Sequence, residues 1–228
     1  MTHRFSPLPV HRQMLVHLNF QGWQDIMRAA WPADLRDCLN HWATHDLPLV
    51  VTRQDLGADS ATAAFAETLF LGLPAPQRWG HRRVALRVDV RQVGISLYDW
   101  PPLAAVLARL PAAPAGWRMA SDYLTHAGLA AQVYGSHGWQ HLTGLSYCHD
   151  ASDLDLRIPV ADLETANRAA ALLAASPDDG RLLDGELCFP DGRAVAWREW
   201  WRWSQGASRV VLFKSLDGAT LATPGATP

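Results

Sequence analysis

Apolar and polar residues alternate most clearly between residues 82 and 96. Valine or leucine occupies every second position over much of this segment, and mostly arginine, alanine and aspartate stand between them. A period of two predicts a β-strand with one buried face and one largely basic face. Arg83, Arg87 and Arg91 recur at every fourth position, so the pattern places all three on the basic face. They are interpreted either as surface charge or as a docking site for an anionic partner.

Apolar spacing and turn residues predict the other elements of the chain. Helices are expected over residues 23–31, 35–45, 62–71 and 102–110, and a strand over residues 48–53. Further along, helices are expected over residues 117–126, 137–143 and 161–175. Strands are expected over residues 131–134, 153–159, 182–189, 194–200 and 210–215, and residues 223–228 form a frayed tail.

Proline and glycine cluster at residues 111–116, which marks the best candidate linker. The chain is therefore expected to divide into an N-terminal domain over residues 1–115 and a C-terminal domain over residues 116–228. Helices and strands are mixed in both parts, which predicts a two-domain α+β protein.

Composition excludes several classes of protein. The chain has 228 residues, 18% charged and 49% apolar, which argues against bulk disorder. Its net charge of −2 argues against a general nucleic-acid-binding protein. No apolar run reaches the ~18 residues of a membrane span, and no apolar core of an export signal stands at the N-terminus. The three cysteines form no CxxC pair. These features predict a cytoplasmic protein that binds neither nucleic acid nor membrane.

Two motifs indicate chemistry on phosphate groups. Gly135-Ser136 stands at an expected strand-to-helix turn, where a close backbone approach and free N–H groups suit phosphate oxygens. Asp153-Leu154-Asp155 begins the next expected strand, and alternation puts both carboxylates on one face. Two such carboxylates are typical ligands of Mg²⁺, which orients a transferring phosphoryl group. Together the motifs resemble the core of a nucleotidyltransferase of the polymerase-β type.

A third carboxylate commonly completes such a site. Asp184 and Glu186 share one face of the expected strand over residues 182–189, and Glu199 on the returning strand is a further candidate. Glu186 is preferred because it stands mid-strand among apolar residues. Lys214, the one lysine of the chain, ends an apolar strand and is a candidate ligand for polyphosphate.

Two other kinds of site fit the sequence poorly. His137 and His141 stand four residues apart, near Cys148 and His149, but no compact second pair completes a zinc site. Gly135-Ser136 lacks the G-x-S-x-G pattern of a hydrolase nucleophile.

The central motifs resemble one family over nearly the whole chain: the malonate decarboxylase holo-acyl-carrier-protein synthases, also called phosphoribosyl-dephospho-CoA transferases. The resemblance rests mainly on residues 135–147 and 152–156. Further matches lie at residues 184–186, 190–192, 196–199 and 212–214, and individually weak ones at residues 45–53, 71–74 and 101–103. Arg157 departs from the pattern, because an apolar residue is expected there.

The resemblance implies a reaction and its partners. The substrate is 2′-(5″-triphosphoribosyl)-3′-dephospho-CoA, and the acceptor is a serine of the acyl-carrier subunit of malonate decarboxylase. Pyrophosphate leaves. Asp153 and Asp155 hold Mg²⁺, with Glu186 or Asp184 as the third ligand. Gly135, Ser136 and Lys214 hold the pyrophosphate.

Two other functions remain open on the sequence alone. A different nucleotidyltransferase, which adenylylates a protein or small molecule from ATP, shares every one of these residues. A non-catalytic binding module that kept the fold is less favoured, because Asp153 and Asp155 are both intact.

Overall fold

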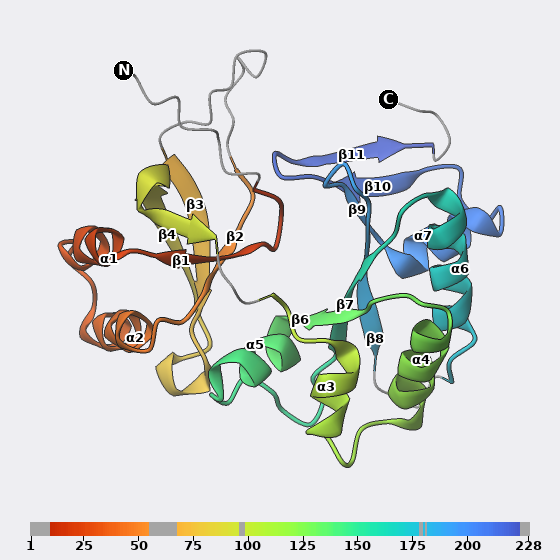
Figure 1. Cartoon of the computed structure of the whole chain (residues 1–228), viewed down its shortest axis with the longest axis horizontal. Helices are drawn as coiled ribbons and strands as arrows, with labels where there is room; N and C mark the ends of the chain where they lie inside the picture. The colour runs from red at the N-terminus through yellow and green to blue at the C-terminus, as the bar shows by residue number, and fades with distance from the viewer. Residues whose placement is uncertain (1–9, 55–67, 96–98, 178–179, 181, 224–228) are drawn as a thin grey trace. The chain divides into compact units, whose positions relative to one another are not determined.

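The computed structural model describes residues 10–54, 68–95, 99–177, 180 and 182–223, and Figure 1 shows its ribbon. The chain divides into two compact units. The first comprises Met1–Asp99 with Leu216–Gly218, and the second comprises Trp100–Ser215 and Ala219–Pro228. Each unit combines helices with a β-sheet, so the α+β class is confirmed.

The first unit is built on an antiparallel sheet with the strand order β4-β3-β2-β1-β5. Its strands are β1 (Leu15–Leu18), β2 (Leu49–Val51), β3 (Thr68–Pro74), β4 (Arg83–Asp89) and β5 (Val93–Ile95). Its α-helices are α1 (Phe20–Met27) and α2 (Ala33–Thr44), and short 3-10 helices span Gln77–Trp79 and Val90–Gln92. Helix α2 and strand β2 lie where the sequence predicts them.

The helix expected over residues 62–71 is wrong where it can be compared. Residues 62–67 lie outside the described residues, and the segment that follows is strand β3. Leu69, Leu71 and Leu73 of this strand are buried, and each of its residues pairs with β4. Cross-strand pairing and an alternating buried face therefore decide the structure here, in place of local helix propensity.

The single strand expected over residues 82–96 is also wrong, because it is broken after Asp89. The carboxylate of Asp89 accepts hydrogen bonds from the backbone N–H of Arg91 and from its guanidinium group, which folds residues 90–92 into a 3-10 turn. These hydrogen bonds lower the pKa of Asp89 to about 2. Arg83 and Arg87 share the exposed face of β4, whereas Arg91 lies in the turn and does not extend it.

The second unit is built on a mixed sheet with the strand order β11-β10-β9-β8-β7-β6. Strands β7 and β8 run parallel, and the other neighbours run antiparallel. The strands are β6 (Gln132–Tyr134), β7 (Leu154–Pro159), β8 (Leu183–Cys188), β9 (Ala194–Ala196), β10 (Val211–Lys214) and β11 (Ala219–Ala222). The helices are α3 (Leu103–Ala108), α4 (Ala115–His126), α5 (Gly135–Thr143), α6 (Leu163–Ala174) and α7 (Trp197–Ser204).

One face of this sheet packs into the core of the second unit. Helices α4, α6 and α7 lie together on one side of β7 and β8 in Figure 1. Helix α6 shows why the sequence folds this way: Asp162 caps its first turn by accepting from the N–H of Thr165, and alanines at helical spacing face the sheet. The buried core includes Leu154, Leu156, Leu187, Trp117 and Trp200.

The boundary between the units differs from the one expected at residues 115 and 116. It falls between Asp99 and Trp100, so helix α3 belongs to the second unit. Leu103, Val106 and Leu107 of α3 are buried in the same core as Trp117 of α4. The proline-rich segment 111–116 thus lies inside the second unit: residues 111–114 belong to the connection between two helices that pack together, and residues 115 and 116 begin α4.

Two further features of the second unit were not predicted. Strand β9 stops at Ala196, and residues 197–200 of the expected returning strand form the first turn of α7. Trp197 and Trp200 are buried at the three-residue spacing of a helix. Strand β11 pairs with β10 although its side chains are largely exposed.

Candidate active site of the second unit

The face of the second sheet opposite the core carries most of the predicted site residues. Leu154, Leu156 and Leu187 point into the core, so the residues that alternate with them lie on the other face. Asp155 of β7, Asp184 and Glu186 of β8, and Lys214 of β10 all have this position. We call this side of the sheet the acid face.

Asp155 and Asp184 occupy directly neighbouring positions on the acid face. They are register partners on the parallel strands β7 and β8, and neighbouring strands lie about 4.8 Å apart. Asp153 lies just before β7 and is exposed. The sequence predicted Asp153 and Asp155 as the pair on one strand, whereas in the structure Asp155 lies on β7 and has Asp184 of β8 as its neighbour. This pairing across two strands is a property of the fold.

Gly135 brings the first turn of α5 against Asp155. Tyr134, the last residue of β6, pairs with Asp155, and Gly135 follows it with φ of +62°. A Cβ atom at Gly135 would lie 2.0 Å from Oδ2 of Asp155, so only glycine leaves room for this carboxylate. Ser136 is the second residue of the same helix and is half-buried. The predicted phosphate motif and the predicted acid motif are thus in direct contact.

Glu186 and Lys214 form an ion pair. Lys214 Nζ donates to Glu186 Oε1 at 2.7 Å, and the side chain of Glu186 is 5% exposed, against 38% for Lys214. The lysine neutralises a carboxylate that is otherwise costly to bury. Glu186 as a metal ligand and Lys214 as a pyrophosphate ligand stay predictions, and their contact couples any change in one to the other.

The remaining acidic candidate, Glu199, has a structural partner. It lies on α7, whereas the sequence placed it on a strand, and its Oε1 accepts a hydrogen bond from the N–H of Leu212 at 2.6 Å. Arg157, which departs from the family pattern, alternates with the core residues of β7 and donates to Gln132 Oε1 at 2.7 Å. By register it stands beside Glu186.

The acid face offers ligands for a divalent cation. Carboxylate oxygens suit Mg²⁺, which is usually held by one or two protein carboxylates together with substrate phosphates. Asp155 and Asp184 supply such a pair. Among the residues that the structure describes, no three His, Cys, Asp or Glu side chains gather closely enough to hold a metal ion. The donor set fits an ion that two carboxylates share with the substrate.

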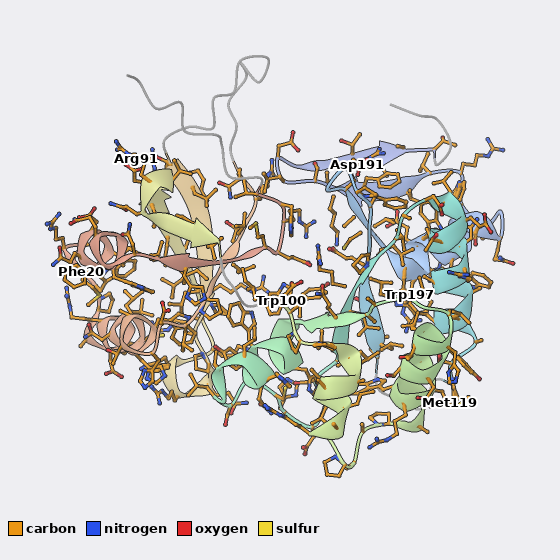
Figure 2. All side chains as sticks on the ribbon, viewed as in Figure 1. Phe20, Arg91, Trp100, Met119, Asp191 and Trp197 are labelled. Atoms are coloured by element: carbon orange, nitrogen blue, oxygen red, sulfur yellow. The ribbon has the colours of Figure 1, made fainter. Side chains whose placement is uncertain are left out.

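Two arginines beside Asp184 were not predicted from the sequence. A hollow of about 580 Å³ is lined by Asp184, Arg198, Glu199 and Arg202, together with small residues. We call it the acid-side hollow. Figure 2 labels Trp197 at the start of α7, the helix that supplies both arginines. The tryptophans and arginines of residues 197–203 were the available signal, and the expectation of a strand there hid the helical spacing of the arginines.

Two family models cover the chain. The model described as phosphoribosyl-dephospho-CoA transferase MdcG N-terminal domain matches residues 11–97, and the corresponding C-terminal domain model matches residues 102–224. The chain belongs to the phosphoribosyl-dephospho-CoA transferase family. These matches confirm the resemblance seen in the sequence, and they divide the chain close to the boundary between the two units.

Relatives that match over most of the chain support the same assignment. A protein of Xanthomonas axonopodis pv. citri named phosphoribosyl-dephospho-CoA transferase is 37% identical over 87% of each chain. One of the same name from Bradyrhizobium diazoefficiens is 33% identical over 93% of this chain and 90% of its own length. No solved structure matches the chain. The relatives are named as transferases, which supports an enzymatic function. None of the described helices has the length and apolar character that crossing a bilayer requires.

Proposed function

We propose that this chain transfers the phosphoribosyl-dephospho-CoA group of 2′-(5″-triphosphoribosyl)-3′-dephospho-CoA to a serine of the acyl-carrier subunit of malonate decarboxylase. Family membership over both units supports the choice of substrate. The observation that carries the chemistry is the convergence of Asp155, Asp184 and the first residue of α5 on one side of the sheet. We further propose that the second unit has a nucleotidyltransferase fold.

In the proposed reaction the serine oxygen of the carrier attacks the phosphorus that is bonded to the 5″ oxygen. A new P–O bond to serine forms, the bond to the outer two phosphates breaks, and pyrophosphate leaves. One carboxylate of the acid face accepts the serine proton. The first turn of α5 at Gly135 and Ser136 directs N–H groups and the Ser136 hydroxyl at phosphate oxygens, with Lys214 as an additional cation. The nucleophile belongs to the partner, so this chain needs none of its own.

Mg²⁺ is the proposed cofactor, and when bound it neutralises the charge on the reacting phosphates. Asp153, Asp155 and either Asp184 or Glu186 were its expected ligands. We propose Asp184 over Glu186, because Asp184 stands beside Asp155 in register and Glu186 is paired with Lys214.

The third carboxylate can be identified by comparing two variants. Asp184→Asn is expected to lower kcat about 10³-fold, because it removes an anionic ligand next to Asp155. Glu186→Gln is expected to act more on stability, since it leaves the ammonium of Lys214 without the carboxylate it contacts. Initial rates of carrier labelling, measured beside thermal unfolding, separate the two effects. A catalytically dead but stable Glu186→Gln, beside an active Asp184→Asn, assigns the ligand to Glu186 instead.

The basic face of β4 is a candidate docking surface for the acidic carrier. Arg87→Glu is expected to raise the KM for the carrier several-fold, because it reverses a charge on an exposed strand face. Added salt should produce a similar rise in the unmodified protein by screening. The KM for the triphosphoribosyl substrate should not change. A rise in that KM alone assigns the arginine to the substrate, and no change in either leaves Arg83 and Arg87 as surface charge.

Mass spectrometry of the carrier tests the proposed function directly. Full-length protein, purified carrier, Mg²⁺ and the triphosphoribosyl substrate should give a mass increase that equals the phosphoribosyl-dephospho-CoA group. Parallel reactions with ATP test the alternative of adenylylation, which the relatives do not favour. A mass increase with ATP, and none with the triphosphoribosyl substrate, contradicts the proposal.

A further inference from the structure

Two hollows of the second unit meet at the same two arginines. Arg198 and Arg202 line the acid-side hollow together with Asp184. They also line a separate pocket of about 270 Å³, whose walls include Trp117, Leu173, Trp197 and Trp201. We call it the tryptophan pocket. The arginines therefore join an aromatic pocket to a hollow that reaches the acid face.

The described walls of the tryptophan pocket are basic as well as aromatic. Among the described residues, none that lines the pocket is acidic, and neither Arg198 nor Arg202 forms an ion pair. Unpaired arginines beside apolar walls attract an anion that carries an apolar or aromatic group.

Two contacts hold the side chain of Arg198 in place, and its Nε has no hydrogen-bond acceptor among the described residues. Its side chain lies over the ring of Trp197, with 4.4 Å between Cζ and the ring centroid, and Nη2 donates to the carbonyl oxygen of Leu183 at 3.2 Å. Its Nε is buried, and no group among the described residues accepts a hydrogen bond from it. A buried N–H without an acceptor is costly, so a ligand that supplies an oxygen there gains affinity. Arg202 is exposed and lies one helical turn further along α7.

The proposed substrate has a group of matching chemistry at a matching place. In the triphosphoribosyl form of dephospho-CoA, the adenosine ribose is joined through its 2′ oxygen to the second ribose, whose 5″ oxygen bears the reacting triphosphate. The adenine and the diphosphate of dephospho-CoA are therefore separated from the reacting phosphorus by two riboses, the second ribose and that of adenosine. Asp184 lies at the corresponding junction, because it belongs both to the acid face and to the acid-side hollow.

We propose that the tryptophan pocket receives the adenine ring of dephospho-CoA, and that Arg198 and Arg202 bind its diphosphate. This inference rests on the proposed function. The aromatic walls contact the base, and the two guanidinium groups bind phosphate oxygens through charge-assisted hydrogen bonds. The acid-side hollow, at about 580 Å³, lies in the ~300–1,000 Å³ range of small-molecule sites and leaves room for the two riboses.

Binding of dephospho-CoA to the full-length protein, measured by calorimetry, tests this assignment. Arg202→Ala is expected to raise the Kd for dephospho-CoA about tenfold, because it removes a charged partner of the diphosphate. Trp201→Leu is expected to raise the Kd for dephospho-CoA several-fold, because it removes an aromatic wall of the pocket. The substitution keeps an apolar side chain at this half-buried position. The Kd for inorganic pyrophosphate should change less than twofold in both variants. Arg209→Ala and Trp203→Leu are matched controls outside both hollows, and they should bind dephospho-CoA normally.

Three outcomes overturn the assignment. An unchanged Kd for dephospho-CoA in Arg202→Ala and Trp201→Leu places the adenosine elsewhere. Equal losses for dephospho-CoA and pyrophosphate in Arg202→Ala mean that the arginine serves the leaving group. If the unmodified protein does not bind dephospho-CoA, neither hollow is a site for this ligand. Labelling of the carrier by the unmodified protein is measured separately. If the carrier is labelled but the variants bind dephospho-CoA normally, the pocket assignment is wrong and the proposed function still holds.

Discussion

Asp155→Asn is expected to lower the rate of carrier labelling about 10³-fold or more while the protein stays folded. Asparagine has nearly the shape of aspartate but lacks its charge, so the change removes the anion at the point where β7, β8 and the first turn of α5 meet. Asp153→Asn should have an effect in the same direction, because Asp153 precedes the same strand. Initial rates by mass spectrometry of the carrier give the size of the loss.

A matched control separates charge at the site from charge elsewhere. Asp191 is exposed in the turn before β9, where it pairs with Arg193. Asp191→Asn should therefore label the carrier at nearly the normal rate. Circular dichroism and thermal unfolding establish that each variant is folded. Turnover by Asp155→Asn within a few-fold of normal, in a folded protein, means that the acid face is not the active site.

Local patterns predicted the second unit better than the first. Strand β7 shows regular alternation, and α6 combines an Asp cap with alanines at helical spacing, so both elements are readable without any knowledge of their partners. Strand β3 depends on its long pairing with β4, which no local pattern reveals. Strand β11 has no continuous buried face and therefore produces no alternation at all.

The division into units could not be obtained from composition. A proline-rich segment is equally suited to a linker and to a tight turn between two packed helices. Residues 111–114 belong to such a turn, because Leu107 of α3 and Trp117 of α4 are buried in one core. Which helices share a core depends on contacts between residues, and proline content carries no information about them.

The candidate site was predictable as a set of residues and not as an arrangement. Alternation placed Asp155 on one strand face and Asp184 and Glu186 on another, but the register that makes Asp155 and Asp184 neighbours arises from parallel pairing of distant segments. The same is true of the ion pair between Glu186 and Lys214. Arg198 and Arg202 escaped notice because residues 197–200 were expected to extend a strand.

Gly135→Ala is expected to lower turnover at least 10²-fold and also to destabilise the protein. Alanine at φ of +62° costs about 1–2 kcal/mol, because its Cβ meets its own backbone in this conformation. The new Cβ would also stand 2.0 Å from Oδ2 and 2.8 Å from Cγ of Asp155. Either the carboxylate or the first turn of α5 must move, and a displacement of about 1 Å at a reacting group can cost 10²-fold in rate.

The other end of α5 supplies the control that separates these two costs. Gly144 has φ of +71°, and a Cβ there meets nothing within 4 Å, so Gly144→Ala carries the backbone cost alone. It should lose about 1–2 kcal/mol of stability and keep its turnover. In the Asp155→Ala background, Gly135→Ala should cost less stability than in the unmodified protein, because Oδ2 and Cγ are gone. Equal stability losses for Gly135→Ala and Gly144→Ala, with normal turnover in both, would show that Gly135 does not seat the carboxylate of Asp155.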